Sequence, residues 1–199
     1  MASDDTYLLG RSAAEIKRLA RQAALIERET EDLFRSSGIT AGMNVLEIGS
    51  GAGDVAMLVG RLVRPDGTVL GIERSADSVA LATQRALGVA DGAVRFEVGD
   101  LNSYAPTGAY DALVGRFVLP YLADPAGPLR RLAAHVRPGG IIAFMEFDVR
   151  QISTTPEAPL FRTVAGWIVG SYERSGVDPS LGSSLGAGFR DAGVEWPYM

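Results

Sequence analysis

From residue 44 onward the sequence alternates between short apolar runs and segments with helical spacing. The apolar runs have the length of β-strands and cover residues 45–48, 68–72, 94–98, 111–117 and 141–147. Apolar residues recur at helical spacing in 55–63, 75–87, 129–136 and 160–172. Strands that alternate with helices form βαβ units around a mostly parallel sheet. Because crossovers are right-handed, we expect an α/β fold with a doubly wound, mostly parallel sheet.

The side chains of each apolar run predict its place in that sheet. The first, fourth and fifth runs are almost entirely apolar, which is typical of central strands covered on both faces. The third run alternates Val94, Phe96 and Val98 with Arg95 and Glu97, so we expect an edge strand there. The helix at 129–136 is expected to end at the turn residues 138–140.

The N-terminal segment has the pattern of one amphipathic helix. Ser12 and Glu15 fit a capping box, and apolar residues then recur at helical spacing from Ile16 to Phe34. Gly38 is a suitable residue to follow the C-terminus of this helix.

The composition excludes several kinds of site and partner. The 199 residues include no Cys and one His, which excludes disulfides, cysteine nucleophiles and His-rich metal sites, so no metal is expected. A net charge of −5 without a long basic run disfavours a nucleic-acid partner. The acidic N-terminus does not resemble a signal peptide, and the sequence has no apolar stretch long enough for a membrane span. We therefore expect a cytoplasmic protein without a membrane partner.

The most informative motif lies where the first strand leads into the first helix of the alternating region. Gly49, Gly51 and Gly53 follow the strand at alternate positions and allow a tight turn and the close approach of a ligand. The spacing G-x-G-x-G differs from the G-x-G-x-x-G of dinucleotide-binding proteins because position 54 is Asp. The motif also lacks the Lys-Ser/Thr of a P-loop, so the loop is not expected to bind a triphosphate.

Two carboxylates end the next two strands. Glu73 lies 20 residues after Gly53, where an acid can accept hydrogen bonds from both hydroxyls of a ribose. Asp100 follows the third strand and can accept from an exocyclic amino group such as that of adenine. Because the carboxyl ends of parallel strands share one edge, the loop and the two acids together predict an adenosine-binding edge.

These residues occur in the order of a known set of motifs. The motifs are Glu47-x-Gly49-x-Gly51-x-Gly53, Glu73, Asp100, Tyr110-Asp111 and Pro138-Gly139-Gly140. In this order they resemble class I S-adenosylmethionine-dependent methyltransferases, and the resemblance runs from about Tyr7 to Phe147. It implies a Rossmann-like fold and S-adenosylmethionine as cofactor. The residues implied to bind this cofactor are Glu47, Gly49, Ser50, Gly51 and Gly53 around the methionine portion, Glu73 at the ribose with Arg74 near the adenine, Asp100 at the adenine amino group with Leu101 beside it, and Arg116 and Phe117 near the sulfonium.

The N-terminal helix is similar to the one that closes over the cofactor in the small-molecule branch of this family. The similarity implies that Tyr7, Arg18 and Gln22 contact the methionine end, where an Arg could pair with a carboxylate. A helix that simply packs on the sheet is the alternative. We therefore expect a helical lid over residues 1–38 and a cofactor-binding domain over 39–199.

Two departures from the family bear on the acceptor and on the C-terminus. Enzymes that methylate nitrogens of nucleic acids and proteins usually carry Asn/Asp-Pro-Pro-Tyr after the fourth strand, whereas residues 115–121 read Gly-Arg-Phe-Val-Leu-Pro-Tyr. A small-molecule acceptor is therefore expected. The family usually ends in an antiparallel hairpin, and residues 194–199 could supply one strand, so we expect a truncated hairpin or a sheet without its last strand.

Few residues are candidates for acid–base chemistry. Glu146 and Asp148 end the fifth strand on one face, and we expect one of them to act as a base or to orient a substrate amine. The alternatives are that they cap the loop that follows or bind the N-terminal arm. His135 lies on the helix before the fifth strand, far from the carboxyl ends of the strands, and we expect it to be structural or solvated. The aromatic residues Tyr121, Trp167 and Tyr172 either line an acceptor pocket or belong to the core.

The function that this pattern favours is methyl transfer from S-adenosylmethionine to O, N or C of a small molecule. A nicotinamide-dependent oxidoreductase would use the same loop and Glu73. A cofactor-binding subunit without catalytic activity is a second alternative.

Overall fold

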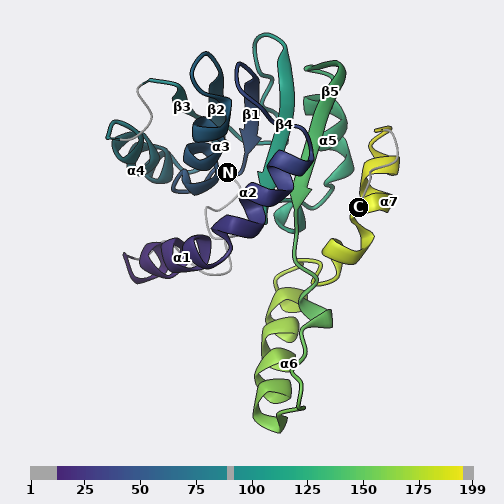
Figure 1. The fold of residues 1–199 in the computed structure, drawn as a ribbon. Coiled ribbons are helices and arrows are strands. Elements are labelled where there is room, and N and C mark those ends of the chain that lie inside the picture. Colours follow the sequence, from purple (N-terminus) through teal and green to yellow (C-terminus); the bar gives the residue numbers. More distant parts are fainter. Residues whose placement is uncertain (1–12, 89–91, 195–199) are drawn as a thin grey trace.

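The computed structural model describes residues 13–88 and 92–194, and its centre is a five-stranded parallel sheet (Figure 1). The strands are β1 (Asn44–Ile48), β2 (Thr68–Glu73), β3 (Val94–Val98), β4 (Tyr110–Arg116) and β5 (Val136–Met145). Their order is β3-β2-β1-β4-β5, and all four neighbouring pairs are parallel. This order confirms the predicted doubly wound α/β fold, and it confirms β3 as an edge strand.

Helices cover both faces of the sheet because successive strand residues point to opposite sides. One face packs against α2 (Glu27–Ser36), α3 (Asp54–Val63) and α4 (Ala76–Ala86), in a core that includes Phe34 and Val45. The other face packs against α5 (Ala126–Ala133) and α7 (Leu181–Asp191), in a core that includes Leu46 and Phe189. Val45 and Leu46 are neighbours on β1 and both fully buried, as expected for a central strand with both faces covered.

Two predictions about the fifth strand were wrong. Within the described residues β5 is the second edge of the sheet, not a central strand. The strand is apolar because Ala143 faces one core and Phe144 faces the other. In a three-layer fold helices cover both faces of the sheet, so an edge strand needs apolar residues on both faces as well. The strand also begins earlier than expected, so α5 ends at Ala133 and residues 138–140 form an irregularity inside β5.

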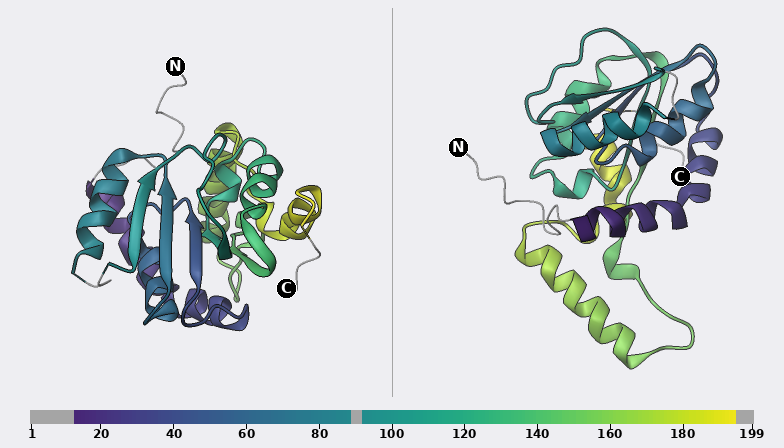
Figure 2. Two further views of the ribbon diagram at one scale, coloured as in Figure 1. Left: turned by 90° about the horizontal axis from the view of Figure 1, so that it is seen from above. Right: turned by 90° about the vertical axis from the view of Figure 1, so that its left-hand side faces the viewer.

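The N-terminal segment is two helices, which corrects the prediction of one. α1 (Ala13–Leu25) and α2 are separated at Ile26, whose φ of −116° and ψ of 15° are not helical. Thr30 and Phe34 of α2 are fully buried against the sheet, whereas α1 crosses the carboxyl ends of the strands (Figure 2). No Gly or Pro marks this change of direction, because packing rather than local propensity determines it.

The C-terminal part contains one element that projects and one that the sequence did not predict. α6 (Pro159–Arg174) extends away from the sheet beyond the carboxyl ends of the strands (Figures 1 and 2). α7 contains three glycines, which lower helix propensity and hide its periodicity. The expected last strand at 194–199 falls almost wholly on residues 195–199, which lie outside the described residues.

Candidate functional site

The glycine loop follows β1 at the point where the sheet order reverses between β1 and β4. Gly49, Gly51 and Gly53 all have positive φ values, of 67°, 52° and 86°. A Cβ at Gly49 would lie 2.3 Å from Val118 Cγ2, and one at Gly53 would lie 2.7 Å from the Phe96 ring, so both glycines are required by the protein's own packing. A Cβ at Gly51 would meet nothing within 4 Å. Gly51 is therefore the glycine at which the loop backbone is open to a ligand.

Two polar groups beneath this loop are buried without a hydrogen-bond partner. They are Oε2 of Glu47, whose side chain is 2% exposed, and Oγ of Ser50, and neither bonds to any residue that the structure describes. Burial raises the pKa of Glu47 to about 8, with Asp54 and Glu73 adding to the effect and Arg116 opposing it. An unpartnered buried carboxylate costs free energy, so it marks a place where a hydrogen-bond donor or a cation would be stabilised.

Arg116 joins the sheet to the N-terminal helices. Its Nη1 donates to Oγ1 of Thr30 on α2 at 2.8 Å, and Thr30 in turn donates to the Ile26 carbonyl at 2.7 Å. Burial lowers the pKa of Arg116, while the carboxylates of Asp54, Glu47 and Glu27 oppose this effect. The guanidinium at the end of β4 therefore lies within electrostatic reach of three acidic side chains, those of Asp54, Glu47 and Glu27.

A second arginine, which no sequence pattern indicated, holds the C-terminal end of the glycine loop. Arg85 of α4 forms an ion pair with Asp54 at 2.7 Å and also donates to the Ala52 carbonyl. This contact spans 31 residues, so no local pattern could have revealed it. It fixes Asp54, the residue that replaces the glycine of the dinucleotide motif, at the N-terminus of α3.

Glu73 lies at the end of β2 as predicted and faces the glycine loop. Its Oε2 accepts from the Gly51 N–H at 3.2 Å and its Oε1 from the Ser75 N–H at 2.9 Å. A carboxylate has further lone pairs, so these bonds leave Glu73 able to accept from hydroxyls of a ligand. Arg74 is exposed beside it.

Asp100 follows β3 on the same edge. Its Oδ1 accepts from the backbone N–H and the side-chain amide of Asn102, both at 2.9 Å, and the side chain is otherwise exposed. Leu101 is buried beneath it. A Cβ at Gly99 would lie 2.4 Å from Tyr104, so the chain before Asp100 is also held by close packing.

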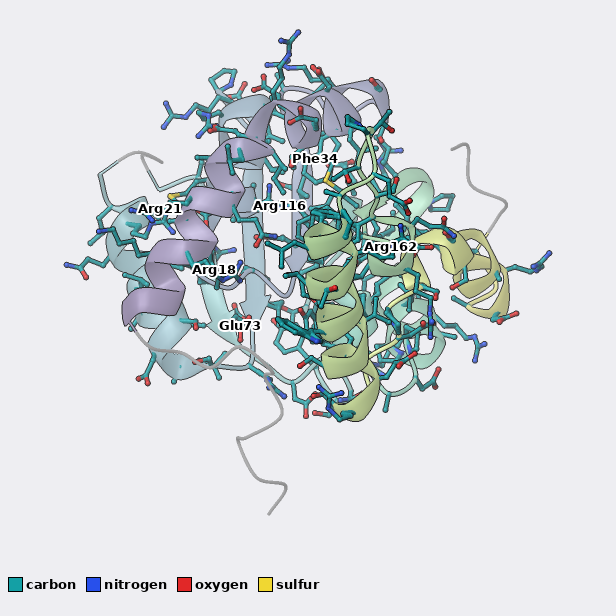
Figure 3. The ribbon with its side chains drawn as sticks, turned by 90° about the horizontal axis from the view of Figure 1, so that it is seen from below. Arg18, Arg21, Phe34, Glu73, Arg116 and Arg162 are labelled. Carbon is teal, nitrogen blue, oxygen red and sulfur yellow. The ribbon has the colours of Figure 1, made fainter. Side chains whose placement is uncertain are left out.

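The N-terminal helix α1 lies over this edge. Arg18 Nη1 donates to Gln22 Oε1 at 2.8 Å, so the two residues expected at the methionine end are adjacent on one helix. In the view onto the carboxyl edge, Arg18 lies on the side of α1 toward Glu73 and Arg116, whereas Arg21 lies on the opposite side (Figure 3). Tyr7, the third residue of that prediction, lies outside the described residues. The role of the lid stays a prediction.

A separate small hollow of about 20 Å³, enough for about one water molecule, lies between the ends of β4 and β5 and the C-terminal end of α6. Half of its lining residues are aromatic, and the full set is Phe117, Pro120, Tyr121, Glu146, Phe147, Val149, Tyr172 and Asp178. The rings of Phe117 and Phe147 stack at 3.9 Å, and Phe117 holds a left-handed φ of 55°, which is uncommon for a residue other than Gly. Of the aromatic candidates, Tyr121 and Tyr172 line this hollow, whereas Trp167 is exposed on α6.

Glu146 and Asp148 do not share a site, although both follow β5. Oε1 of Glu146 accepts from the Val118 and Leu119 N–H groups at 3.1 and 3.0 Å, and its buried Oε2 has no partner among the described residues. Burial raises the pKa of Glu146 to about 7. Asp148 caps the short helix 149–151 and accepts a hydrogen bond from the Ser183 hydroxyl. These contacts correspond to the loop-capping role that was the alternative for this residue.

His135 lies at the start of β5, away from this edge, and its Nδ1 is 3.2 Å from the Gly108 carbonyl. This position agrees with the structural role expected for it.

The chain belongs to a methyltransferase family. Residues 39–167, more than half of the chain, match the family model described as a methyltransferase domain. The resemblance to class I S-adenosylmethionine-dependent methyltransferases is thereby confirmed for family and fold.

Curated relatives share part of their length with this chain. The chain is 34% identical over 140 residues to trans-aconitate 2-methyltransferase of Methylobacterium nodulans, covering 70% of this chain and 50% of the relative. It is 34% identical over 114 residues to a ubiquinone biosynthesis O-methyltransferase of Sodalis glossinidius, covering 56% and 44%. The chain thus spans about half the length of the curated relatives it matches.

Solved structures agree on the fold. An S-adenosylmethionine-dependent methyltransferase from Aquifex aeolicus superposes with a TM-score of 0.63 at 23% identity, covering 84% of this chain and 89% of that one. The [4+2]-cyclase SpnF superposes with a TM-score of 0.53 at 28% identity, covering 60% and 44%. A protein named for a different reaction thus shares the fold, so the site has to carry the functional argument. In the part of the chain that the structure describes, no helix is long and apolar enough to cross a membrane.

Proposed function

We propose that this protein transfers a methyl group from S-adenosylmethionine to a small-molecule acceptor. The observation that carries the proposal is the set of acidic hydrogen-bond acceptors in the crevice beside the glycine loop. Glu47, Asp54 and Glu73 all lie there, and Glu47 has a buried oxygen without a partner. Such a crevice suits a nucleoside that donates hydrogen bonds, and a positive charge on that ligand would favour the ionised form of Glu47.

The residues present fit S-adenosylmethionine in three respects. Glu47 and Ser50 offer unpartnered acceptors beneath the loop, next to the open backbone of Gly51. Glu73 and Asp100 offer carboxylates at the next two strand ends, for ribose hydroxyls and the adenine amino group. The bound cofactor supplies a methyl group already activated by its sulfonium, so the protein's main task is to orient the two reactants and exclude water.

The same charges disfavour the nicotinamide alternative. A dinucleotide places its pyrophosphate at the N-terminus of the helix after the glycine loop. Here that helix begins with Asp54, so a pyrophosphate would meet a carboxylate at the helix N-terminus. Electrostatic repulsion therefore favours the sulfonium nucleoside.

We further propose that α1 closes over the cofactor as a lid, with residues 39–199 as the cofactor-binding domain. Arg18 carries a positive charge at the edge where a methionine carboxylate would lie, and an arginine can bind a carboxylate through two hydrogen bonds. The pair Arg18–Gln22 is preformed on α1, so little side-chain freedom remains to be lost on binding.

Isothermal titration calorimetry tests the cofactor. We expect S-adenosylhomocysteine to bind in the micromolar range and NAD not to bind. Glu73→Ala should abolish or strongly weaken the binding, while Glu31→Ala, at an exposed ion pair on α2, should leave it unchanged. Binding of NAD, or full affinity in Glu73→Ala, would contradict the proposal.

A methyl-labelled cofactor with a panel of small acceptors then tests for turnover. Labelled product supports an enzyme. Tight cofactor binding without any methylated product across the panel would favour the alternative of a cofactor-binding subunit.

A further inference from the structure

The helix α6 is attached to the rest of the molecule mainly at its C-terminal end. There Glu173 pairs with Arg150, and the hydroxyl oxygen of Tyr172 lies 3.4 Å from that of Tyr121. The rest of the helix projects beyond the sheet, and an open groove of about 450 Å³ lies between it and the preceding segment 149–158 (Figures 1 and 2). No residue of α6 is buried by the part of the chain that the structure describes. A helix held in this way gains little from packing within its own domain.

The projecting part of α6 carries an apolar stripe. The α6 stripe consists of Leu160, Phe161, Val164, Trp167 and Ile168, which are 74%, 38%, 39%, 67% and 41% exposed. At about 100° per residue these positions lie within an arc of about 120°, and no charged residue falls inside this arc. A helix of a globular protein normally turns an apolar arc of this width toward a core. The α6 stripe therefore has the width of a buried surface but is exposed to solvent.

The charges of α6 do not favour a lipid surface or a charged peptide as the partner of this stripe. Between residues 159 and 169 the only charged residue is Arg162, which lies on the opposite side of the helix and pairs with Glu157. Helices that lie on membranes usually carry several basic residues on their polar face, and the whole chain has a net charge of −5. The partner that suits an uncharged stripe is another apolar surface.

The α6 stripe is arranged symmetrically about Val164. Leu160 and Ile168 lie four residues before and after it, and Phe161 and Trp167 lie three residues before and after it. A two-fold axis at Val164 would therefore place Leu160 of one copy against Ile168 of the other, and Phe161 against Trp167. An interface between two identical copies requires this kind of self-complementary surface. None of these pairings brings like charges together.

We propose that the α6 stripe is the interface of a homodimer, in which α6 helices of two copies pack antiparallel about a two-fold axis at Val164. This inference goes beyond the proposed methyl transfer and does not depend on it. With about 150–250 Å² for a large side chain, the exposed fractions correspond to roughly 500 Å² per copy. Two copies would bury about 1,000 Å², the area at which specific interfaces begin.

Sedimentation of the full chain at about 1 to 100 μM tests for the dimer. We expect a monomer–dimer equilibrium with a micromolar dissociation constant, because the buried area is at the lower end for specific interfaces. Val164→Glu should abolish the dimer in this range, since two carboxylates would meet at the axis. The matched control Gly166→Glu places the same charge on the opposite side of α6, where a Cβ meets nothing within 4 Å, and should leave the dimer intact.

A variant without a new charge gives a second measurement at the same surface. Trp167→Ala should weaken the dimer by about 30-fold or more, as is typical of a tryptophan at the centre of an interface. Circular dichroism checks that each variant is folded. A wild type that stays monomeric at 100 μM, or a dimer that persists unchanged in Val164→Glu and Trp167→Ala, would overturn the proposal.

Cross-linking tests the antiparallel arrangement, because the chain contains no Cys of its own. Val164→Cys should form a covalent dimer on mild oxidation, since helices packed about 8–10 Å apart bring their facing Cα atoms into disulfide range. Leu160→Cys should not, because the antiparallel pairing separates the two copies of position 160 by about 12 Å along the helices. Cross-linking of both variants to the same extent, or of neither, would overturn this arrangement.

Cosedimentation with phosphatidylcholine vesicles tests the other occupant of an apolar stripe. We expect the wild type to stay in solution. A protein that binds the vesicles through α6, and loses this binding in Val164→Glu but not in Gly166→Glu, would assign the stripe to a lipid surface and refute the homodimer. None of these measurements involves the cofactor, so their outcome is independent of the proposed methyl transfer.

Discussion

Replacement of Glu47 by Gln should change how the stability of this protein depends on pH. The pKa of Glu47 rises from its ordinary value of 4.5 to about 8 because the side chain is buried. A displacement of this size corresponds to roughly 4–5 kcal/mol of folding free energy. The folded state binds the proton more tightly than the unfolded state, so stability is full below pH 4.5 and is lost as the pH rises toward 8.

The Gln variant isolates this effect because an amide resembles the protonated carboxyl group. Its oxygen can accept from the Ala56 N–H, which bonds to Glu47 in the wild type. Between pH 6 and pH 8 the wild type should lose about 2–3 kcal/mol that Glu47→Gln does not lose. Titration of Glu146 affects both proteins alike and cancels in the comparison.

Urea denaturation followed by circular dichroism at pH 6, 7 and 8 measures this difference, provided that the two proteins have equal m-values. Glu31→Gln should follow the wild type at every pH. Parallel profiles for the wild type and Glu47→Gln would refute the argument, since they would mean that Glu47 is ionised in the folded protein at pH 6. We also expect Glu47→Gln to bind S-adenosylhomocysteine more weakly, because the amide cannot ionise to strengthen a hydrogen bond from a ligand.

Two further predictions concern packing. Gly49→Ala should cost about 1–3 kcal/mol more than Gly51→Ala by thermal denaturation, because both adopt positive φ but only Gly49 would clash with Val118; equal losses would show that the Val118 contact is not tight. Phe34→Ala should destabilise by about 3–5 kcal/mol because its ring is fully buried between α2 and the sheet, whereas Leu25→Ala, 81% exposed, should change stability by less than about 0.5 kcal/mol. A loss below about 1 kcal/mol for Phe34→Ala would mean that α2 does not pack as described.

The strands and the first strand-end residues could be predicted because their signals are local. An apolar run bounded by glycines specifies a buried strand, and the carboxyl ends of parallel strands must meet at one edge. Glu73 therefore faces the glycine loop as expected, where it accepts from Gly51. The edge position of β5 could not be predicted, because a strand covered on both faces has the same composition in the centre of a sheet and at its edge.

Other parts depend on contacts between residues distant in sequence. The break at Ile26 follows from α2 packing on the sheet, and no residue type marks it. The pairing of Arg85 with Asp54 and that of Arg116 with Thr30 join residues 31 and 86 positions apart. An arginine in a helix gives no sign of which distant carboxylate or hydroxyl it will reach, so periodicity alone could not identify either contact.

The turn after β4 connects the two halves of the candidate site. Val118 packs against Gly49 of the glycine loop, and its N–H donates to Glu146 at the end of β5. A shift of this turn therefore changes the position of the glycine loop and the hydrogen bonding of the carboxylate together. Burial raises the pKa of Glu146, and the Leu119 and Val118 N–H groups lower it, so displacement of the turn would raise that pKa further. Close packing of Val118 against Gly49 thus contributes to the acidity of a group on the opposite side of the turn.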